Sequence, residues 1–284
     1  MEKLIRALTK EDLPSLQAME TGIEDDYVIR VFERISTGNN KLFGLFSNDQ
    51  LVSVGGLTVF AKQYAMLGRM RSDLRFRGND LSTHLMKKVM EEAFKMPEIN
   101  WVGANTQEEN IPAQRVLKKI GLTEHHISYG ASARTLSGLE KGQAVWKPVD
   151  SISAKRQWLR RLYVESSAVF PYECYYPFPA TEEMFEDAKV AGWRFFENDK
   201  GDRVLITKHD VKKYNFLHAI YPFGDVMEQD GLWDTISFAR DELSKEFSPG
   251  LRIWMDLTKQ QAASLPDNHP FSLPSPWILF GKSR

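Results

Sequence analysis

A basic, glycine-containing turn stands directly before a predicted helix and has the chemistry to hold a diphosphate. Arg75 and Arg77 supply positive charge, and Gly78 lets a ligand approach the backbone closely. Apolar residues recur about once per helical turn from Leu81 onward, which predicts a helix beginning close to Asn79. The amino terminus of a helix presents unpaired N–H groups and the positive end of the helix dipole. A turn of this composition suits a pyrophosphate.

The two arginines also conflict with a local rule. Arginine near a helix amino terminus is unfavourable for the helix dipole unless an anion is bound there. Because such violations tend to mark function, we favour ligand binding over solvated charge for Arg75 and Arg77. For Gly78 the alternative of a purely structural role in a tight turn stays open.

The elements that must position this turn follow from the apolar periodicity. The pattern predicts a strand, two helices and a three-stranded antiparallel meander before the turn, and a strand and a second helix after its helix. In chain order the predicted ranges around the turn are 4–8, 10–19, 26–35, 41–47, 51–60, 64–74, 100–106 and 110–122.

The turn carries a specific resemblance. Residues 75–79, Arg-Phe-Arg-Gly-Asn, resemble the coenzyme A loop of GNAT acyltransferases, whose pattern is Q/R-x-x-G-x-G/A. Asp80 departs from the pattern and brings a negative charge near the diphosphate. The next residues, Leu81, Ser82 and Thr83, are similar to the helix start at which this family's amides and hydroxyls face the phosphates.

A second segment resembles the same family. Asn110, Ala113, Gly121 and Leu122 match its N-x-x-A-x-x-x-Y-x-x-x-G-F helix, which flanks the pantetheine arm. Asn110 equally suits an ordinary helix N-cap. Leu117 occupies the position of the tyrosine that often protonates the leaving thiolate. Because leucine cannot donate a proton, either a different acid or water protonates the thiolate, or the chain does not catalyse the reaction.

The resemblance implies a mixed-sheet α/β fold and an N-acetyltransferase that uses acetyl-CoA as acyl donor. A primary amine, of a small molecule or a peptide, then attacks the thioester directly, and backbone N–H groups near Met70 stabilise the oxyanion. Glu108 and Glu109 are candidate bases at the end of the fifth strand, although a solvated acidic loop is the favoured interpretation. Tyr129 is a candidate acid, although a half-buried strand tyrosine is favoured.

The second half repeats the order of elements at a nearly constant offset. Equivalent elements begin at positions 51, 79 and 101 and again at 203, 231 and 252. This predicts two tandem GNAT-like domains, at 1–148 and 149–284. The second domain is degenerate, because its counterpart of the coenzyme loop carries only acidic charge and repels a diphosphate. We therefore expect it to serve as a scaffold or as a wall of the acceptor site.

An aromatic, proline-containing segment surrounds the only cysteine, Cys174. This segment, residues 168–178, either lines an acceptor pocket or caps the core of the second half. A nucleophilic Cys174 is disfavoured, because no histidine or basic neighbour that would lower its pKa is apparent in the sequence.

Composition excludes several function classes. The net charge of -1 provides no field for nucleic acid, and no apolar run is long enough for a signal peptide or a membrane span, so we expect a cytoplasmic protein without membrane partners. One cysteine excludes an internal disulfide, and no metal site is predicted. The sequence leaves a monomer and a homodimer both open. The chief alternative function is a non-catalytic acyl-CoA sensor, and a third interpretation is an unrelated α/β binding module.

Overall fold

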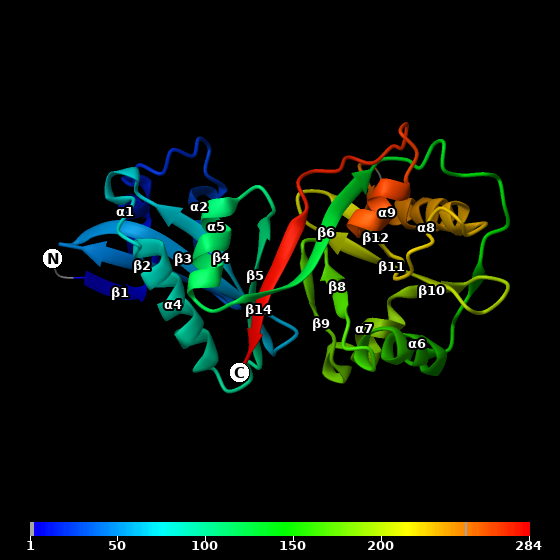
Figure 1. Ribbon diagram of the computed structural model, residues 1–284, viewed down its shortest axis with the longest axis horizontal. Coiled ribbons are helices and arrows are strands. Elements are labelled where there is room, and N and C mark those ends of the chain that lie inside the picture. Colours follow the sequence, from blue (N-terminus) through cyan, green and yellow to red (C-terminus); the bar gives the residue numbers. More distant parts are fainter. Residues whose placement is uncertain (1–2, 248) are drawn as a thin grey trace. The chain divides into compact units, whose positions relative to one another are not determined.

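The computed structural model describes residues 3–247 and 249–284, and these form two compact units (Figure 1). The first unit contains the chain up to His125 together with residues 278–284 at the carboxyl end. The second unit contains residues 126–277. Both units contain parallel as well as antiparallel strand pairs together with helices, which confirms the predicted mixed α/β fold class.

The first unit has its strands in the order β1-β2-β3-β4-β5-β14. Their bounds are β1 Lys3–Ala7, β2 Asn40–Ser47, β3 Gln50–Phe60, β4 Tyr64–Ser72, β5 Trp101–Gln107 and β14 Trp277–Ser283. Neighbours from β1 to β4 are antiparallel, whereas β4 and β5 are parallel. The parallel pair is joined by a helical crossover, as parallel strands require.

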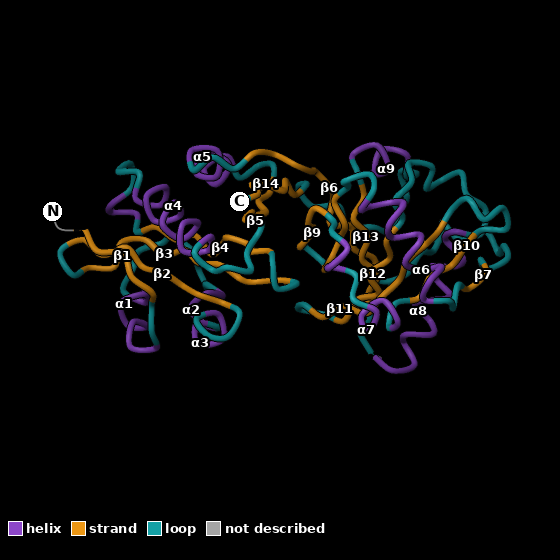
Figure 2. The backbone as a smooth tube through the Cα atoms, turned by 90° about the horizontal axis from the view of Figure 1, so that it is seen from below, coloured by secondary structure: helices purple, strands orange, loops and turns teal. Residues whose placement is uncertain are grey.

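Helices cover both faces of this sheet. Figure 2 shows α4 and α5 on one face and α1 to α3 on the other. The bounds are η1 Lys10–Asp12, α1 Leu13–Gln17, α2 Tyr27–Arg30, α3 Phe32–Ile35, η2 Leu74–Phe76, α4 Leu81–Phe94 and α5 Ile111–Lys119. The single helix predicted over 26–35 is in fact two short helices, because Val31 leaves the helical region with ψ of 17°.

The second unit repeats the strand order of the first. Its strands run in the order β7-β10-β11-β12-β13-β6, in which β12 and β13 pair in parallel and the other neighbours pair antiparallel. The bounds are β6 Thr123–Ala133, β7 Lys147–Pro148, α6 Ile152–Leu159, η3 Arg160–Val164, β8 Val169–Glu173, β9 Tyr176–Pro179, η4 Glu182–Met184, α7 Asp187–Ala191, β10 Arg194–Glu197, β11 Val204–Val211, β12 Asn215–Ile220, α8 Leu232–Phe247, β13 Arg252–Leu257 and α9 Lys259–Ser264.

The boundary between the units differs from the one expected after residue 148. The cause is an exchange of strands. Most of β6 belongs to the second unit, where it pairs with β13 from Ala133–Ile253 to Tyr129–Leu257, while residues 278–283 of β14 complete the first unit. The chain therefore crosses from one unit to the other near His125 and returns at Ile278.

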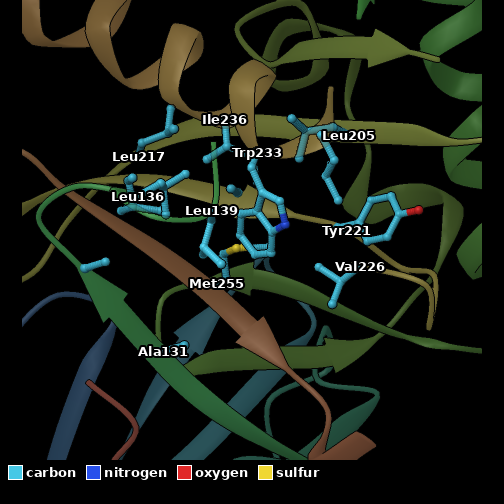
Figure 3. Close-up of a cluster of buried hydrophobic side chains, with 14 of the residues drawn as sticks. Ala131, Leu136, Leu139, Leu205, Leu217, Tyr221, Val226, Trp233, Ile236 and Met255 are labelled. Atoms are coloured by element: carbon cyan, nitrogen blue, oxygen red, sulfur yellow. The ribbon is translucent and has the colours of Figure 1, made fainter. Parts of the chain in front are cut away.

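The core of the second unit lies between its sheet and α8. Figure 3 shows Trp233 reaching from α8 into a cluster that includes Leu139, Ile236 and Met255. The β8–β9 hairpin is a separate two-stranded sheet, which the periodicity does not predict. None of the helices in the described residues has the length and apolar character that a membrane crossing requires.

Candidate functional site

The turn before α4 presents a row of backbone amides. Gly78 has φ of 85° and Asp80 has φ of 52°, so both lie in the left-handed region. Within the described chain, the amides of residues 78–83 have no hydrogen-bond acceptor, and the first helical amide that finds one is that of His84, which donates to Asp80 O at 3.0 Å. Alternating backbone of this kind forms an anion-binding concavity, and the helix dipole adds to it.

Arg75 is not available to a ligand in the way the pattern predicts. Its Nε donates to Asp73 Oδ1 at 2.8 Å, and its Nη2 pairs with Asp73 Oδ2. Its Nη1 lies 3.2 Å from Glu20 Oε1. The Asp73 side chain is fully buried, and the Arg75 guanidinium lowers the pKa of this carboxyl to about 2. Arg75 therefore holds the turn in place.

Arg77 is the arginine that the turn offers to solvent. It is exposed, and in the described residues it makes no ion pair. Asn79 supports the turn, because its side-chain amide donates to Phe76 O at 3.1 Å. Arg77 is consequently the charge best placed to meet an anion at the amide row.

The first turn of α4 serves structure as well as the site. Leu81 is buried against the sheet, and Thr83 is half-buried. The Ser82 hydroxyl bonds with the hydroxyls of Ser72 and Ser53 inside the unit. The predicted contribution of Ser82 to phosphate binding therefore rests on its amide.

Asp80 is partly neutralised. Its carboxylate lies 2.6 Å from Lys119 Nζ at the end of α5, and both side chains are exposed. The negative charge that departs from the family pattern is thus balanced by a cation from the second matching segment.

Strand β4 carries an irregularity next to the turn. Gly56 pairs with Gly68 and Val54 pairs with Arg71, so Arg69 and Met70 together face one residue of β3. Such an arrangement, with two residues opposite one, is a β-bulge. Arg69 has φ of 59° within it, in the left-handed region. The parallel pairing with β5 extends only to Leu67, so β4 and β5 separate where the bulge lies. The backbone around Met70 therefore departs from regular strand pairing at the place where an oxyanion-binding N–H is expected.

Helix α5 begins with Asn110, whose side chain accepts from the Ala113 amide at 3.2 Å. Asn110 is thus an N-cap, as the structural interpretation predicts. Leu117 has 0% exposure and packs in the core of the unit. No proton donor occupies the family's tyrosine position.

The candidate acid–base residues belong to different units. Glu108 and Glu109 follow β5 directly, and their backbone carbonyls accept from Gln114 Nε2 at 2.6 Å and from Ile111 N at 2.9 Å. Tyr129 lies in the other unit, where it packs against the hydrophobic core. Its placement agrees with a half-buried strand tyrosine.

The equivalent helix start in the second unit is closed. The Gly231 amide donates to Gln143 Oε1 at 2.6 Å, and the amides of Lys141 and Gly142 donate to the carboxylate of Asp234 in the first turn of α8. A Cβ on Gly231 would lie 2.3 Å from Ala144 O, so the covering segment packs directly on the turn.

Two acidic residues of the loop before this helix, residues 221–231, are also bound internally. Asp225 accepts from Arg203 Nε at 2.9 Å and from the Tyr221 hydroxyl at 2.7 Å. Asp230 accepts from Gln143 Nε2 at 3.0 Å. The helix start therefore has no open amide row at Gly231, in keeping with a second unit that lacks a diphosphate site.

The aromatic segment forms the β8–β9 hairpin and packs on the second unit. The ring centres of Tyr175 and Trp254 lie 4.3 Å apart, and Cys174 is fully buried beside Trp254 and Phe216. Burial raises the pKa of the Cys174 thiol far above its ordinary value. These contacts favour the interpretation of this segment as a cap on the core.

Sequence reasoning missed a buried lysine beneath this hairpin. Lys208 donates to Tyr172 O and lies 5.1 Å from the Trp193 ring centre, and burial lowers its pKa to about 8. It helps to line a cavity of about 360 Å³ together with Glu173 and Asp210. In the sequence, only the position of Lys208 within the strand pattern of β11 could have indicated that its side chain is buried.

Comparison with known proteins agrees with the fold and the first unit. Residues 4–123 match the model of the family described as "Acetyltransferase (GNAT) domain". No curated protein matches the sequence significantly. The match covers the amide row, Arg77, the bulge and all of α5. It confirms the predicted resemblance to the GNAT acetyltransferase family.

Two solved structures resemble the chain over nearly its whole length. A GCN5-related N-acetyltransferase from Sphaerobacter thermophilus is 14% identical, with a TM-score of 0.54 over 99% of this chain and 95% of that one. A candidate acetyltransferase from Pyrococcus horikoshii is 11% identical, with a TM-score of 0.52 over 99% of this chain and 89% of that one. Both likenesses extend through both units and concern the fold alone.

Proposed function

We propose that this chain, whose residues 4–123 match the GNAT acetyltransferase family, transfers an acetyl group from acetyl-CoA to a primary amine. The observation that carries the proposal is the row of unpaired amides at residues 78–83, with Arg77 exposed beside it. Such a row offers N–H donors to the diphosphate of the donor, and Arg77 adds positive charge beside it.

The proposed reaction needs no covalent enzyme intermediate. A neutral amine nitrogen attacks the thioester carbon, the new C–N bond forms and the C–S bond breaks. The nitrogen gives up one proton to water, and coenzyme A leaves as a thiolate that takes up one proton. The bulge at Met70 lies where β4 and β5 separate, which supports the proposal that its N–H binds the developing oxyanion. Water is our proposed proton donor to the thiolate, because Leu117 is buried and cannot serve.

For the second unit we propose a degenerate copy of the same fold. Its repeated strand order and its single parallel pair at the equivalent place support this. We propose that it supplies a scaffold or acceptor-site wall for the amine of a small molecule or peptide. Since the donor is an intracellular metabolite, the proposed site of action is the cytoplasm.

The test is thiol release from acetyl-CoA with a panel of primary amines, namely small aliphatic amines, free peptide amino termini and lysine peptides. Release with at least one amine, reduced in Arg77→Ala and retained in Arg34→Ala, supports transfer. Arg34 is the matched control, an exposed arginine of the same unit without an ion pair among the described residues.

A second candidate function is a non-catalytic acyl-CoA sensor, and Leu117 in place of a proton donor is the observation that favours it. Binding of acetyl-CoA without thiol release from any amine would replace transfer by sensing. Absence of acetyl-CoA binding in a folded protein would overturn both and leave an unrelated binding module.

A further inference from the structure

Three potential metal ligands of the second unit converge from separate elements. Cys174 lies in the turn of the β8–β9 hairpin, Asp210 on β11 and His218 on β12. One ligand atom from each, namely the sulfur, a carboxylate oxygen and a ring nitrogen, lies within 4.8 Å of the others. Asp210 is further held in place because its Oδ2 accepts from the Cys174 amide at 2.6 Å.

The His218 ring has a free lone pair on one nitrogen, as a metal ligand needs. Its Nε2 lies 2.7 Å from Asp256 Oδ2, and since an ionised carboxylate only accepts, Nε2 carries the hydrogen. Nδ1 is then left with a lone pair. The side chain is 0% exposed, and Nδ1 has no hydrogen-bond partner. Buried polar atoms are rarely left in this way, so the vacant lone pair is an independent sign of a missing partner.

We propose that Cys174, Asp210 and His218 bind one Zn²⁺ or a similar divalent transition-metal ion. Thiolate, imidazole and carboxylate are the ligand types zinc takes in proteins, and sulfur disfavours Mg²⁺ and Ca²⁺. A carboxylate behind the ligating histidine, here Asp256, is the usual support that fixes the ring and its tautomer.

The geometry requires only a modest contraction. Ligand bonds of about 2.0 to 2.3 Å in a tetrahedral site place neighbouring donor atoms roughly 3.5 Å apart. The separations of up to 4.8 Å must therefore shorten by about 1 Å. The fourth position goes to water, and the cavity that Asp210 lines provides an approach to the site.

The site gives the hairpin a structural role. Cys174 enters from the hairpin turn, whereas both other ligands belong to the sheet, so the ion ties the two together. A Cys–His–Asp nucleophile is the competing interpretation of these residues. Cys174 has 0% exposure and does not line the cavity, so a substrate cannot reach its sulfur, whereas a small ion could enter beside Asp210, which does line the cavity.

The first experiment uses the wild-type full chain without a histidine tag, stripped with a chelator and titrated with Co²⁺. We expect one equivalent to bind and to give the near-ultraviolet thiolate-to-cobalt charge-transfer band. Cys174 is the only cysteine, so this band can come from no other residue. Zn²⁺ should displace the cobalt and raise the midpoint of thermal unfolding.

Three variants localise the site. We expect Cys174→Ser to lose the band and Asp256→Asn to weaken Co²⁺ binding about 10- to 100-fold. The control His209→Gln, a neighbouring histidine outside the cluster, should bind as the wild type does. Co²⁺ binding without the band, or no binding to the folded wild type, overturns the proposal, whether or not Cys174→Ser folds. Because acetyl-CoA takes no part in these readouts, the outcome is independent of the proposed transferase activity.

Discussion

Replacing Arg77 by alanine tests the assignment of the amide row most directly. Arg77 is exposed and has no ion pair in the described residues, so its guanidinium is free to meet a phosphate. A charge-assisted hydrogen bond contributes about 1.5 to 3 kcal/mol. The exposed setting favours the lower end, and about 1.4 kcal/mol is a tenfold change in affinity. We therefore expect Arg77→Ala to weaken acetyl-CoA binding about tenfold.

The assay is isothermal titration calorimetry with acetyl-CoA at two salt concentrations, with thermal unfolding of the same samples. Arg77→Ala should leave the unfolding midpoint unchanged and reduce the salt dependence of binding, since one contact to phosphate is lost. Arg34→Ala should bind as the wild type does. Unchanged affinity of folded Arg77→Ala at both salt concentrations would refute the assignment of this turn to the diphosphate.

Arg75 must be tested separately from Arg77. Removing Arg75 leaves the buried Asp73 carboxylate without its main partner, so Arg75→Ala should lower the unfolding midpoint. A double replacement would mix this loss of stability with the loss of a ligand contact. Weaker binding in the double variant alone would therefore not identify which arginine meets the phosphate.

Three further predictions concern single positions. Asp80→Gly should tighten acetyl-CoA binding about two- to fivefold, as measured by calorimetry. The change removes a negative charge and frees Lys119, and glycine suits the positive φ at this position. Weaker binding would mean that Asp80 orders the turn. The stability advantage of the wild type over Arg75→Ala should be complete above about pH 5 and be lost progressively as the pH falls toward about 1, because Arg75 lowers the pKa of Asp73 from 3.8 to about 2. A pH-independent difference in denaturant unfolding would contradict this. Gly231→Ala should lower the unfolding midpoint yet leave the affinity for acetyl-CoA unchanged, because the new Cβ meets a backbone carbonyl; an undisturbed midpoint would show that the covering segment can move.

Local features of the site could be predicted from the sequence. Gly78 before an apolar helical repeat locates the amide row, because helix starts are determined by neighbouring residues. The engagement of Arg75 could not be predicted in the same way. Its partner Asp73 is only two residues away, but the pair forms because η2 folds the chain back and burial excludes water from the carboxylate.

Non-local features escaped the sequence for a different reason. Strand periodicity does not say which unit a strand joins, so the exchange of β6 and β14 near His125 and Ile278 could not be predicted. The convergence of Cys174 with His218 depends on the pairing register of β11 and β12 and on a hairpin whose prolines obscure the strand pattern. No spacing in the chain encodes such a meeting.

The two helix starts show why charge alone does not decide whether a turn binds a diphosphate. An open row of amides is stable when water or an anion accepts its hydrogen bonds. A protein that no longer binds the anion gains stability when those amides donate to its own acceptors. In the second unit Gln143 and the carboxylate of Asp234 take part in this closure, and Gly231 lets the covering segment pack against the turn. Arginine introduced into the acidic loop would therefore meet a closed turn. Recovering a diphosphate site there requires removal of the cover as well as reversal of the charge.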